Sequence, residues 1–174
     1  MKRPVIALLL TFIGTLAAAF SAAAAEPSNE ITAENVIRIM NEYRADEGLP
    51  PLHGETRLAL AAGDRMRHME DEGYWAHESP DGLTPFVWVR SREYNFQVAG
   101  ENLASGFETA RLLVQSWMES PGHRANIMSE DYEDCGIAII DGATTGPATG
   151  KSIVVLFGKQ KRTIETVIAR GLKQ

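Results

Sequence analysis

The sequence predicts an α+β fold for a single domain, and three observations support this prediction. Apolar residues recur at the spacing of one helical face, for example at Leu58, Ala62, Met66 and Met69. Two shorter segments, Cys135 to Ile140 and Ile153 to Phe157, are apolar enough to be buried strands. Removal of a predicted leader leaves about 149 residues, an ordinary size for one domain with one core.

The N-terminus is predicted to be a secretory signal. Lys2 and Arg3 precede an apolar run over residues 5–20, and the small residues of 21–25 follow it. We therefore predict that residues 1–25 are a signal peptide cleaved after Ala25. The run is shorter than the ~20 residues that a membrane-spanning helix needs, so no transmembrane segment is expected after signal removal. The product is expected to be secreted or periplasmic.

The first helix is predicted to run from Thr32 to about Glu47. Threonine is a preferred N-cap residue, and Ile31 and Val36 occupy the two apolar positions of a hydrophobic staple. Gly48 then permits a left-handed exit, and the prolines that follow prevent the helix from continuing.

Two further helices are predicted before the middle of the chain. The second runs from about Thr56 to Glu72 and ends at Gly73. Thr84 as N-cap and Pro85 at the first helical position open a short third helix.

The second half combines strands with helices. A short strand from about Asn95 to Ala104 leads into a Gly-Glu-Asn string, and a fourth helix follows over about 108–120. Because a glycine- and threonine-rich segment over 141–151 joins the two apolar strands, we expect an antiparallel hairpin. From about Thr163 the tail places apolar residues at helical spacing, which predicts an extra C-terminal helix.

Charge and cysteine content exclude some classes of protein. The formal charge is −6, from 17 basic and 23 acidic residues, and it becomes 15 − 23 = −8 without Lys2 and Arg3. Such a balance disfavours a nucleic-acid partner. Cys135 is the single cysteine, so no intrachain disulfide can form, and we expect a monomer stabilised by its core. Cys135 itself is interpreted as a small buried residue.

Three short strings carry groups suited to binding or catalysis. His77 lies in His-Glu-Ser-Pro-Asp-Gly, Glu101 in Gly-Glu-Asn-Leu-Ala, and His123 in Trp-Met-Glu-Ser-Pro-Gly-His-Arg-Ala-Asn-Ile-Met. The Ser-Pro-Gly step cannot continue a helix, so His123 is predicted to lie just beyond a helix end. We expect the three side chains to project from separate loops into one cleft.

In this order the strings resemble the family that joins cysteine-rich secretory proteins, antigen 5 and pathogenesis-related-1 proteins, the CAP or SCP domain. They are most similar to its bacterial members. The resemblance covers residues 31–158 and implies an α-β-α sandwich whose central cleft holds histidines and acids. Residues 159–174 would then be a C-terminal helical extension.

The resemblance also assigns site residues. His77, Glu101 and His123 match positions of the family's cleft. Relatives from plants and animals carry a second acid three residues after the helix tryptophan, where this chain has Ser120. Glu119 comes one residue early, about 100° away around a helix, and is kept as a candidate. Polar residues beside the motifs are expected to support the site, namely Asn102, Arg124 and Asn126.

A divalent metal is one ligand that these residues could hold. Two imidazoles and a carboxylate can be three ligands of a tetrahedral zinc site with water as the fourth, and metal binding has been described for some family members. If zinc or another divalent cation binds, we predict His77, Glu101 and His123 as its ligands. Alternatively, the histidines brace their loops through hydrogen bonds and Glu101 acts only as an acceptor.

Three functions stay open. The first is a module that binds an extracellular lipid, small molecule or protein in the cleft without catalysis. The second is a metal-dependent hydrolase using the same cleft, since protease activity has been proposed for a few relatives. The third is a structural envelope protein that binds a partner through its C-terminal helix. The chain has no Gly-x-Ser-x-Gly elbow and no glycine-rich phosphate loop, and no catalytic residue can be assigned.

Overall fold

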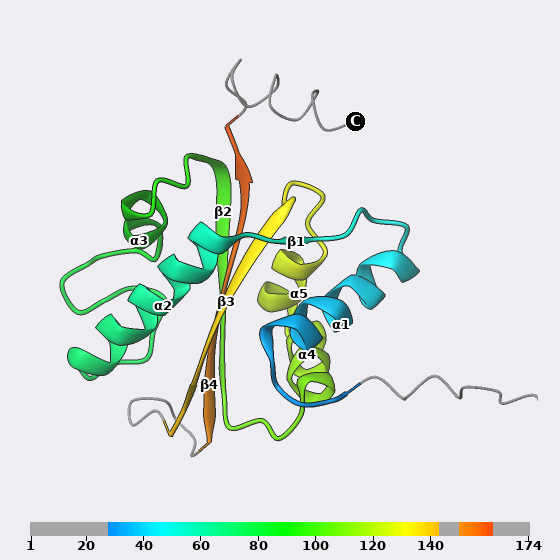
Figure 1. The fold of residues 1–174 in the computed structure, drawn as a ribbon, viewed down its shortest axis with the longest axis horizontal. Coiled ribbons are helices and arrows are strands. Elements are labelled where there is room, and N and C mark those ends of the chain that lie inside the picture. Colours follow the sequence, from blue (N-terminus) through cyan, green and yellow to red (C-terminus); the bar gives the residue numbers. More distant parts are fainter. Residues whose placement is uncertain (1–27, 143–149, 162–174) are drawn as a thin grey trace, which may run out of the picture.

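The computed structural model describes residues 28–142 and 150–161, which form a four-stranded sheet with helices on both faces (Figure 1). Helices α1, α4 and α5 cover one face, and α2 and α3 cover the other. This layering confirms the predicted α-β-α sandwich. The helices are α1 (Ala33–Asp46), α2 (Thr56–Asp71), α3 (Phe86–Ser91), α4 (Ala110–Glu119) and α5 (Pro121–Ile127).

The sheet has the strand order β1-β3-β4-β2. Strands β3 (Asp134–Asp141) and β4 (Lys151–Gln160) pair antiparallel, which confirms the predicted hairpin. The two-residue strand β1 (His53–Gly54) pairs parallel with β3. Strand β2 (Phe96–Ser105) forms the other edge and runs antiparallel to β4, with Glu101 opposite Leu156.

The apolar core lies in two layers because successive side chains of β4 point to opposite faces of the sheet. Val155 and Phe157 pack with the cluster beneath α1, α4 and α5, which includes Trp117. Val154 and Leu156 belong to the cluster beneath α2 and α3. All five of these residues are almost completely buried.

Local sequence signals set the starts of two helices. The Thr32 hydroxyl accepts from the Asn35 N–H at 3.2 Å, which confirms the predicted cap of α1. Thr109 caps α4 in the same way, accepting from the Leu112 N–H at 3.2 Å. The predicted start of α4 at residue 108 was therefore slightly early.

His123 lies just beyond the end of α4, as predicted, but the expectation that His123 and Glu101 lie in loops was wrong. His123 lies in the first turn of α5, because Pro121 has the φ that a helix start requires and lacks only an N–H that the first turn does not use. Glu101 lies within strand β2 and not in a loop. Position 100 of this strand requires a glycine, since a Cβ there would overlap the Tyr132 hydroxyl.

Some predictions fall outside the described residues, namely the signal peptide over 1–25 and the tail helix from Thr163. Strand β4 continues past Gly158, the expected end of the domain, to Gln160. Within the described part of the chain, no helix is long and apolar enough to cross a membrane.

Candidate functional site

Glu101 is a buried carboxylate at the sheet edge. Its place in β2, opposite Leu156, directs the side chain to the face covered by α2, where the residue is 6% exposed. Arg65 of α2 donates its Nε–H to Oε1 of Glu101 at 3.2 Å. A buried cation at this distance offsets part of the cost of removing the carboxylate from water.

Arg65 is itself held in a closed network. Its guanidinium donates to the Tyr74 hydroxyl and to the Ala76 carbonyl, and its Cζ atom lies 4.8 Å from the centroid of the Trp88 ring. The Arg65 side chain is fully buried. Arg65 therefore joins α2 to the segment that leads into His77, and it fixes one oxygen of Glu101.

His77 takes the other oxygen of this carboxylate. Nδ1 of His77 lies 2.7 Å from Oε2 of Glu101, while 59% of the imidazole side chain is exposed. This hydrogen bond raises the pKa of His77 above its usual range. With Nδ1 facing Glu101, Nε2 is the ring nitrogen left to meet a ligand from solvent.

His123 lies beside His77 in a different environment. The centroids of the two imidazole rings are 6.5 Å apart, and the His123 ring centroid is 6.4 Å from that of Trp117. Burial lowers the pKa of His123, and the nearby His77 lowers it further. The pair thus combines one imidazole that favours the proton with one that disfavours it.

Two asparagines connect α5 to the strand that carries Glu101. Asn126 donates its Nδ2–H to the Glu101 carbonyl at 3.0 Å and to Oδ1 of Asn102 at 2.8 Å. Asn102 in turn donates to the His123 carbonyl at 3.1 Å. These bonds fix the first turn of α5, and with it His123, against β2.

The structure does not bring the other two predicted residues to this group. The Glu119 carboxylate accepts from the Gln115 side chain one helical turn earlier, at 3.0 Å on an exposed surface. Arg124 extends toward the end of α1, where its Nη2 lies 3.7 Å from Oε1 of Glu47.

Sequence reasoning missed Arg65. Its position was nevertheless informative, because Arg65 stands three residues after Ala62 and four before Met69. An arginine on the apolar stripe of a helix has to be buried with a partner. Glu101, in a motif already singled out, was the available acid.

A hollow of about 330 Å³ opens next to His77 and Glu101. Besides these two residues, Glu78, Thr84, Pro85 and Phe86 line it. The volume lies at the lower end of the range for small-molecule sites, roughly 300 to 1,000 Å³. One wall therefore carries ionisable groups, and the other carries the apolar start of α3.

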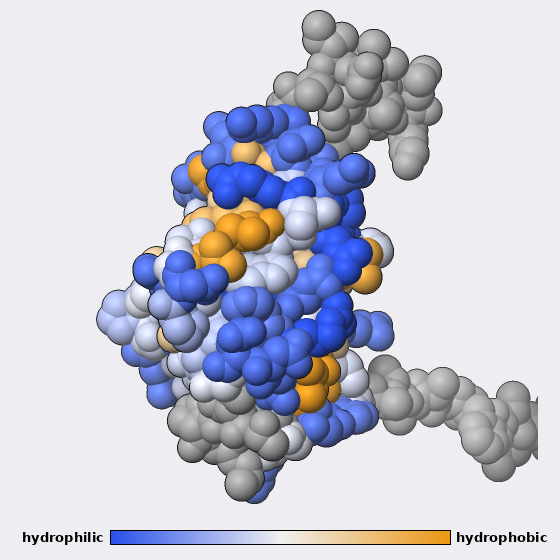
Figure 2. Space-filling model, turned by 90° about the vertical axis from the view of Figure 1, so that its left-hand side faces the viewer, coloured by the Kyte–Doolittle hydropathy of each residue, from blue (hydrophilic) through white to orange (hydrophobic). Residues whose placement is uncertain are grey.

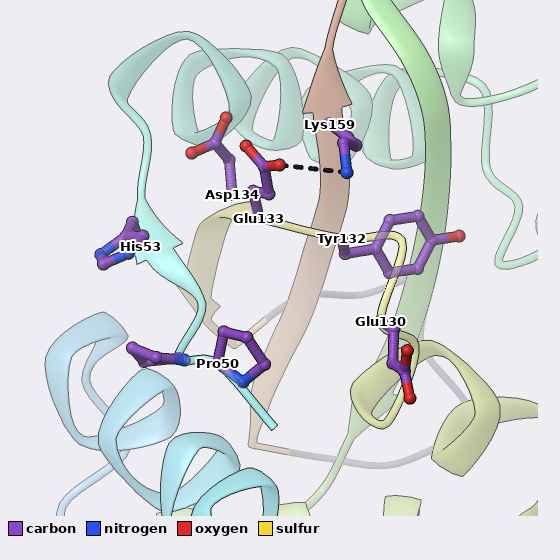
Figure 3. A pocket seen from close by; sticks show the side chains of 8 residues that line it. Pro50, His53, Glu130, Tyr132, Glu133, Asp134 and Lys159 are labelled. Carbon is purple, nitrogen blue, oxygen red and sulfur yellow. Dashed lines mark ion pairs between the residues drawn. The ribbon is translucent and has the colours of Figure 1, made fainter. Parts of the chain in front are cut away.

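A second hollow, of about 650 Å³, lies at the β1 side of the sheet (Figure 3). Figure 3 shows the carboxylates of Glu133 and Asp134 pointing away from Pro50, with Glu133 paired to Lys159 at 3.1 Å. The Tyr94 hydroxyl donates to Asp134 at 2.7 Å. Glu133 and Asp134 are thus engaged with neighbouring side chains.

The histidines and Glu101 do not form a three-ligand metal site in this arrangement. Both oxygens of Glu101 already bind Arg65 and His77. Two imidazoles on one tetrahedral zinc, with Zn–N of about 2.0 Å, bring their ring centroids to roughly 5 Å, closer than the 6.5 Å found here. Over residues 28–142 and 150–161, no group of three or more His, Cys, Asp or Glu side chains is arranged to hold a metal ion.

Comparison with known proteins adds family information. A sequence model described as CAP, the cysteine-rich secretory protein family, matches residues 37–155. The uncharacterized protein YkwD of Bacillus subtilis (strain 168) is 32% identical over 108 residues, which cover 62% of this chain and 42% of YkwD. The uncharacterized membrane protein YlbC of the same strain is 26% identical over 61% of this chain and 31% of YlbC. This chain spans less than half the length of either relative.

Two solved structures have a similar fold. An extracellular SCP-domain protein of Bacillus anthracis (strain Ames) gives a TM-score of 0.62 at 25% identity, covering 73% of this chain and 40% of that chain. An outer surface protein of Borrelia burgdorferi gives a TM-score of 0.65 at 24% identity, and the match covers 78% of this chain and 100% of the Borrelia chain.

Proposed function

This chain belongs to the CAP, or cysteine-rich secretory protein, family, and on that premise we propose that it is a secreted or periplasmic module that binds an extracellular ligand beside His77, Glu101 and His123. The ligand is expected to be bound without being chemically changed. Relatives described as extracellular or as outer surface proteins are consistent with secretion.

The observation that carries the proposal is the chain of contacts from Arg65 through Glu101 to His77. It holds an exposed imidazole in one orientation, with Nδ1 2.7 Å from the carboxylate. Fixing a largely exposed ring costs side-chain entropy, and a ring fixed in advance loses less freedom when a ligand binds. The adjoining hollow of about 330 Å³ offers an apolar wall at Phe86 for the rest of the ligand.

A metal is not needed for this function. Because Glu101 is occupied by Arg65 and His77, the donors open to a cation are the two imidazoles, and three protein ligands are the usual number at a catalytic zinc site. Zinc coordination by His77, Glu101 and His123 stays a prediction, and it requires the two imidazole rings to come closer than the 6.5 Å that separates their centroids here.

Nuclear magnetic resonance titration tests the proposal. Protein with labelled histidines is titrated with zinc chloride and, separately, with a fragment set of carboxylic acids, amines and fatty acids. We expect saturable shifts at His77 and His123, and an affinity at least about tenfold weaker in His77→Ala and His123→Ala, equivalent to about 1.4 kcal/mol. His53→Ala, an exposed histidine on β1, is the matched control and should bind as the wild type does.

Saturable binding that is unchanged in both site variants would overturn the proposal. Turnover of a peptide or ester that stops on addition of a chelator would favour the metal-dependent hydrolase instead.

A further inference from the structure

Strand β2 leaves part of its outer edge unpaired. It is the last strand of the sheet, and the outward carbonyls of Glu101 and Leu103 are covered by side-chain donors, from Asn126 at 3.0 Å and Trp117 at 3.1 Å. Outward-facing backbone groups alternate along an antiparallel strand, so the N–H and C=O of Ala99 face outward too. Within the described residues, nothing outside the β2–β4 ladder hydrogen-bonds to Ala99.

A hollow flanks each end of this unpaired stretch. One is the hollow of about 330 Å³ that includes Glu101, and the other, of about 290 Å³, includes Phe96 and Gln97. Phe96 and Glu101 are separated by roughly 16 Å in an extended strand, a span that suits a ligand of about five residues.

An apolar surface lies between the two hollows. Phe86 lines one hollow and Phe96 lines the other, and their ring centroids are 5.7 Å apart. Figure 2 shows a small apolar area at the height of α3, bordered by hydrophilic surface. Every second side chain of an added strand could pack on such a surface.

The hollow of about 290 Å³ beside Phe96 is basic in an otherwise acidic protein. Arg90 and Lys161 line it, and Arg90 lies over the Phe96 ring at 4.7 Å. Neither cation forms an ion pair with another described residue, whereas the whole chain carries a formal charge of −6. An acidic side chain is therefore the complement that this end of the strand lacks.

We infer that β2 binds an extended peptide segment, which adds to the sheet through the backbone of Ala99 and places an acidic side chain near Arg90 and Lys161. Main-chain hydrogen bonds supply affinity in this mode, and pockets for side chains supply selectivity. The inference rests on the proposed function because the peptide-binding edge of β2 begins at Glu101, which belongs to the proposed ligand site. It specifies that the ligand is a peptide.

The test uses the full chain and the acetylated, amidated peptide Glu-Val-Thr-Val-Thr, with a copy in which lysine replaces glutamate. We expect the glutamate peptide to bind, to slow amide exchange at Ala99 at least about tenfold, and to bind more tightly than the lysine copy. The charge-reversed pair Arg90→Glu and Lys161→Glu should invert this preference, whereas Lys151→Glu, at the far end of β4, should not.

Backbone pairing is tested by Ala99→Pro, which removes the outward N–H but no bond of the β2–β4 ladder, so the fold should persist. Ala99→Ser keeps the N–H and is the matched control. Peptide affinity should fall at least about tenfold in the proline variant only. Loss of binding in Ala99→Pro with retention in His77→Ala would support the edge even if the histidine site failed.

Other outcomes overturn the inference. These are binding of neither peptide at millimolar concentration, equal binding by both, or binding without protection of Ala99. Protection at Ala99 that rises with protein concentration and needs no peptide would assign the edge to a second copy of this chain.

Discussion

At the residue scale, two buried arginines organise this protein, and both escaped a search for apolar spacing. Arg44 is 1% exposed, and its guanidinium donates to the carbonyls of Pro50 at 2.7 Å, Ile127 at 2.7 Å and Ser129 at 2.8 Å. Pro50 follows α1, Ile127 is the last residue of α5, and Ser129 lies just after that helix. A sequence pattern cannot identify backbone carbonyls as partners, because every residue carries one.

Replacing Arg44 should therefore destabilise the fold strongly. Arg44→Met keeps much of the side-chain volume but leaves three carbonyls without their donors, and we expect a loss of about 3 kcal/mol in the free energy of unfolding. Arg38→Met, which removes an exposed pair with Glu42, should cost less than about 1 kcal/mol. Urea unfolding of both variants measures the difference, and equal losses would contradict the role given to Arg44.

The burial of Cys135 was predicted correctly from the sequence. Cys135 is completely buried, as expected for a small apolar residue at the start of a strand, and burial raises the pKa of its thiol to about 12. A thiol with so high a pKa is a poor nucleophile at neutral pH.

At the element scale, the close approach of α2 to β3 depends on Gly136. A Cβ at this position would overlap backbone atoms of Leu58 and Ala59. Gly136→Ala should therefore force α2 away from the sheet and lower the unfolding free energy by about 3 kcal/mol. The matched control is Gly122→Ala in α5, where a Cβ meets nothing within 4 Å and should be neutral or slightly stabilising. Thermal unfolding of the two variants decides, and a stable Gly136→Ala protein would show that the helix packing is looser than described.

Helices and strands were predicted correctly where neighbouring residues carry a clear signal. The Thr32 cap and the hairpin of β3 and β4 were predicted because each depends on neighbouring residues. Strand β1 was missed because its two residues are defined only by pairing with Asp134 and Cys135, far along the chain. Helix α5 was missed because Pro121 both ends one helix and starts the next.

At the scale of the whole molecule, the described residues already bury both faces of the sheet. The two apolar clusters are built from α1 through β4. We therefore expect that deletion of 163–174 leaves a folded domain, with a free energy of unfolding within about 1 kcal/mol of the full chain. Circular dichroism melts compare the two proteins. Global unfolding of the truncated chain would show that the tail belongs to the core.

The site was only partly predictable at this scale. The motifs indicated His77, Glu101 and His123, and these are the residues that lie together. The role of Arg65 and the different contacts of Glu119 and Arg124 depend on how the helices pack. A motif does not specify that packing.

The site has a definite pH dependence. The hydrogen bond to Glu101 raises the pKa of His77 in the folded protein. The stability that this interaction adds is fully present below the unfolded pKa of about 6.5, and it is lost as the pH rises through the folded pKa. The pKa of His123 is lowered, so it acts oppositely and disfavours the folded state as pH falls below about 6.5.

Titration of the individual imidazole resonances tests the central claim, that Glu101 fixes His77 beside a His123 whose pKa is lowered by burial. We predict that His77 titrates above the usual value of about 6.5 and His123 below it, and that Glu101→Gln lowers the midpoint of His77. Gln115→Glu adds a carboxylate on the outer surface of α4 and should leave His77 unchanged. Two histidines that titrate together near 6.5, with His77 indifferent to Glu101→Gln, would contradict the site described here.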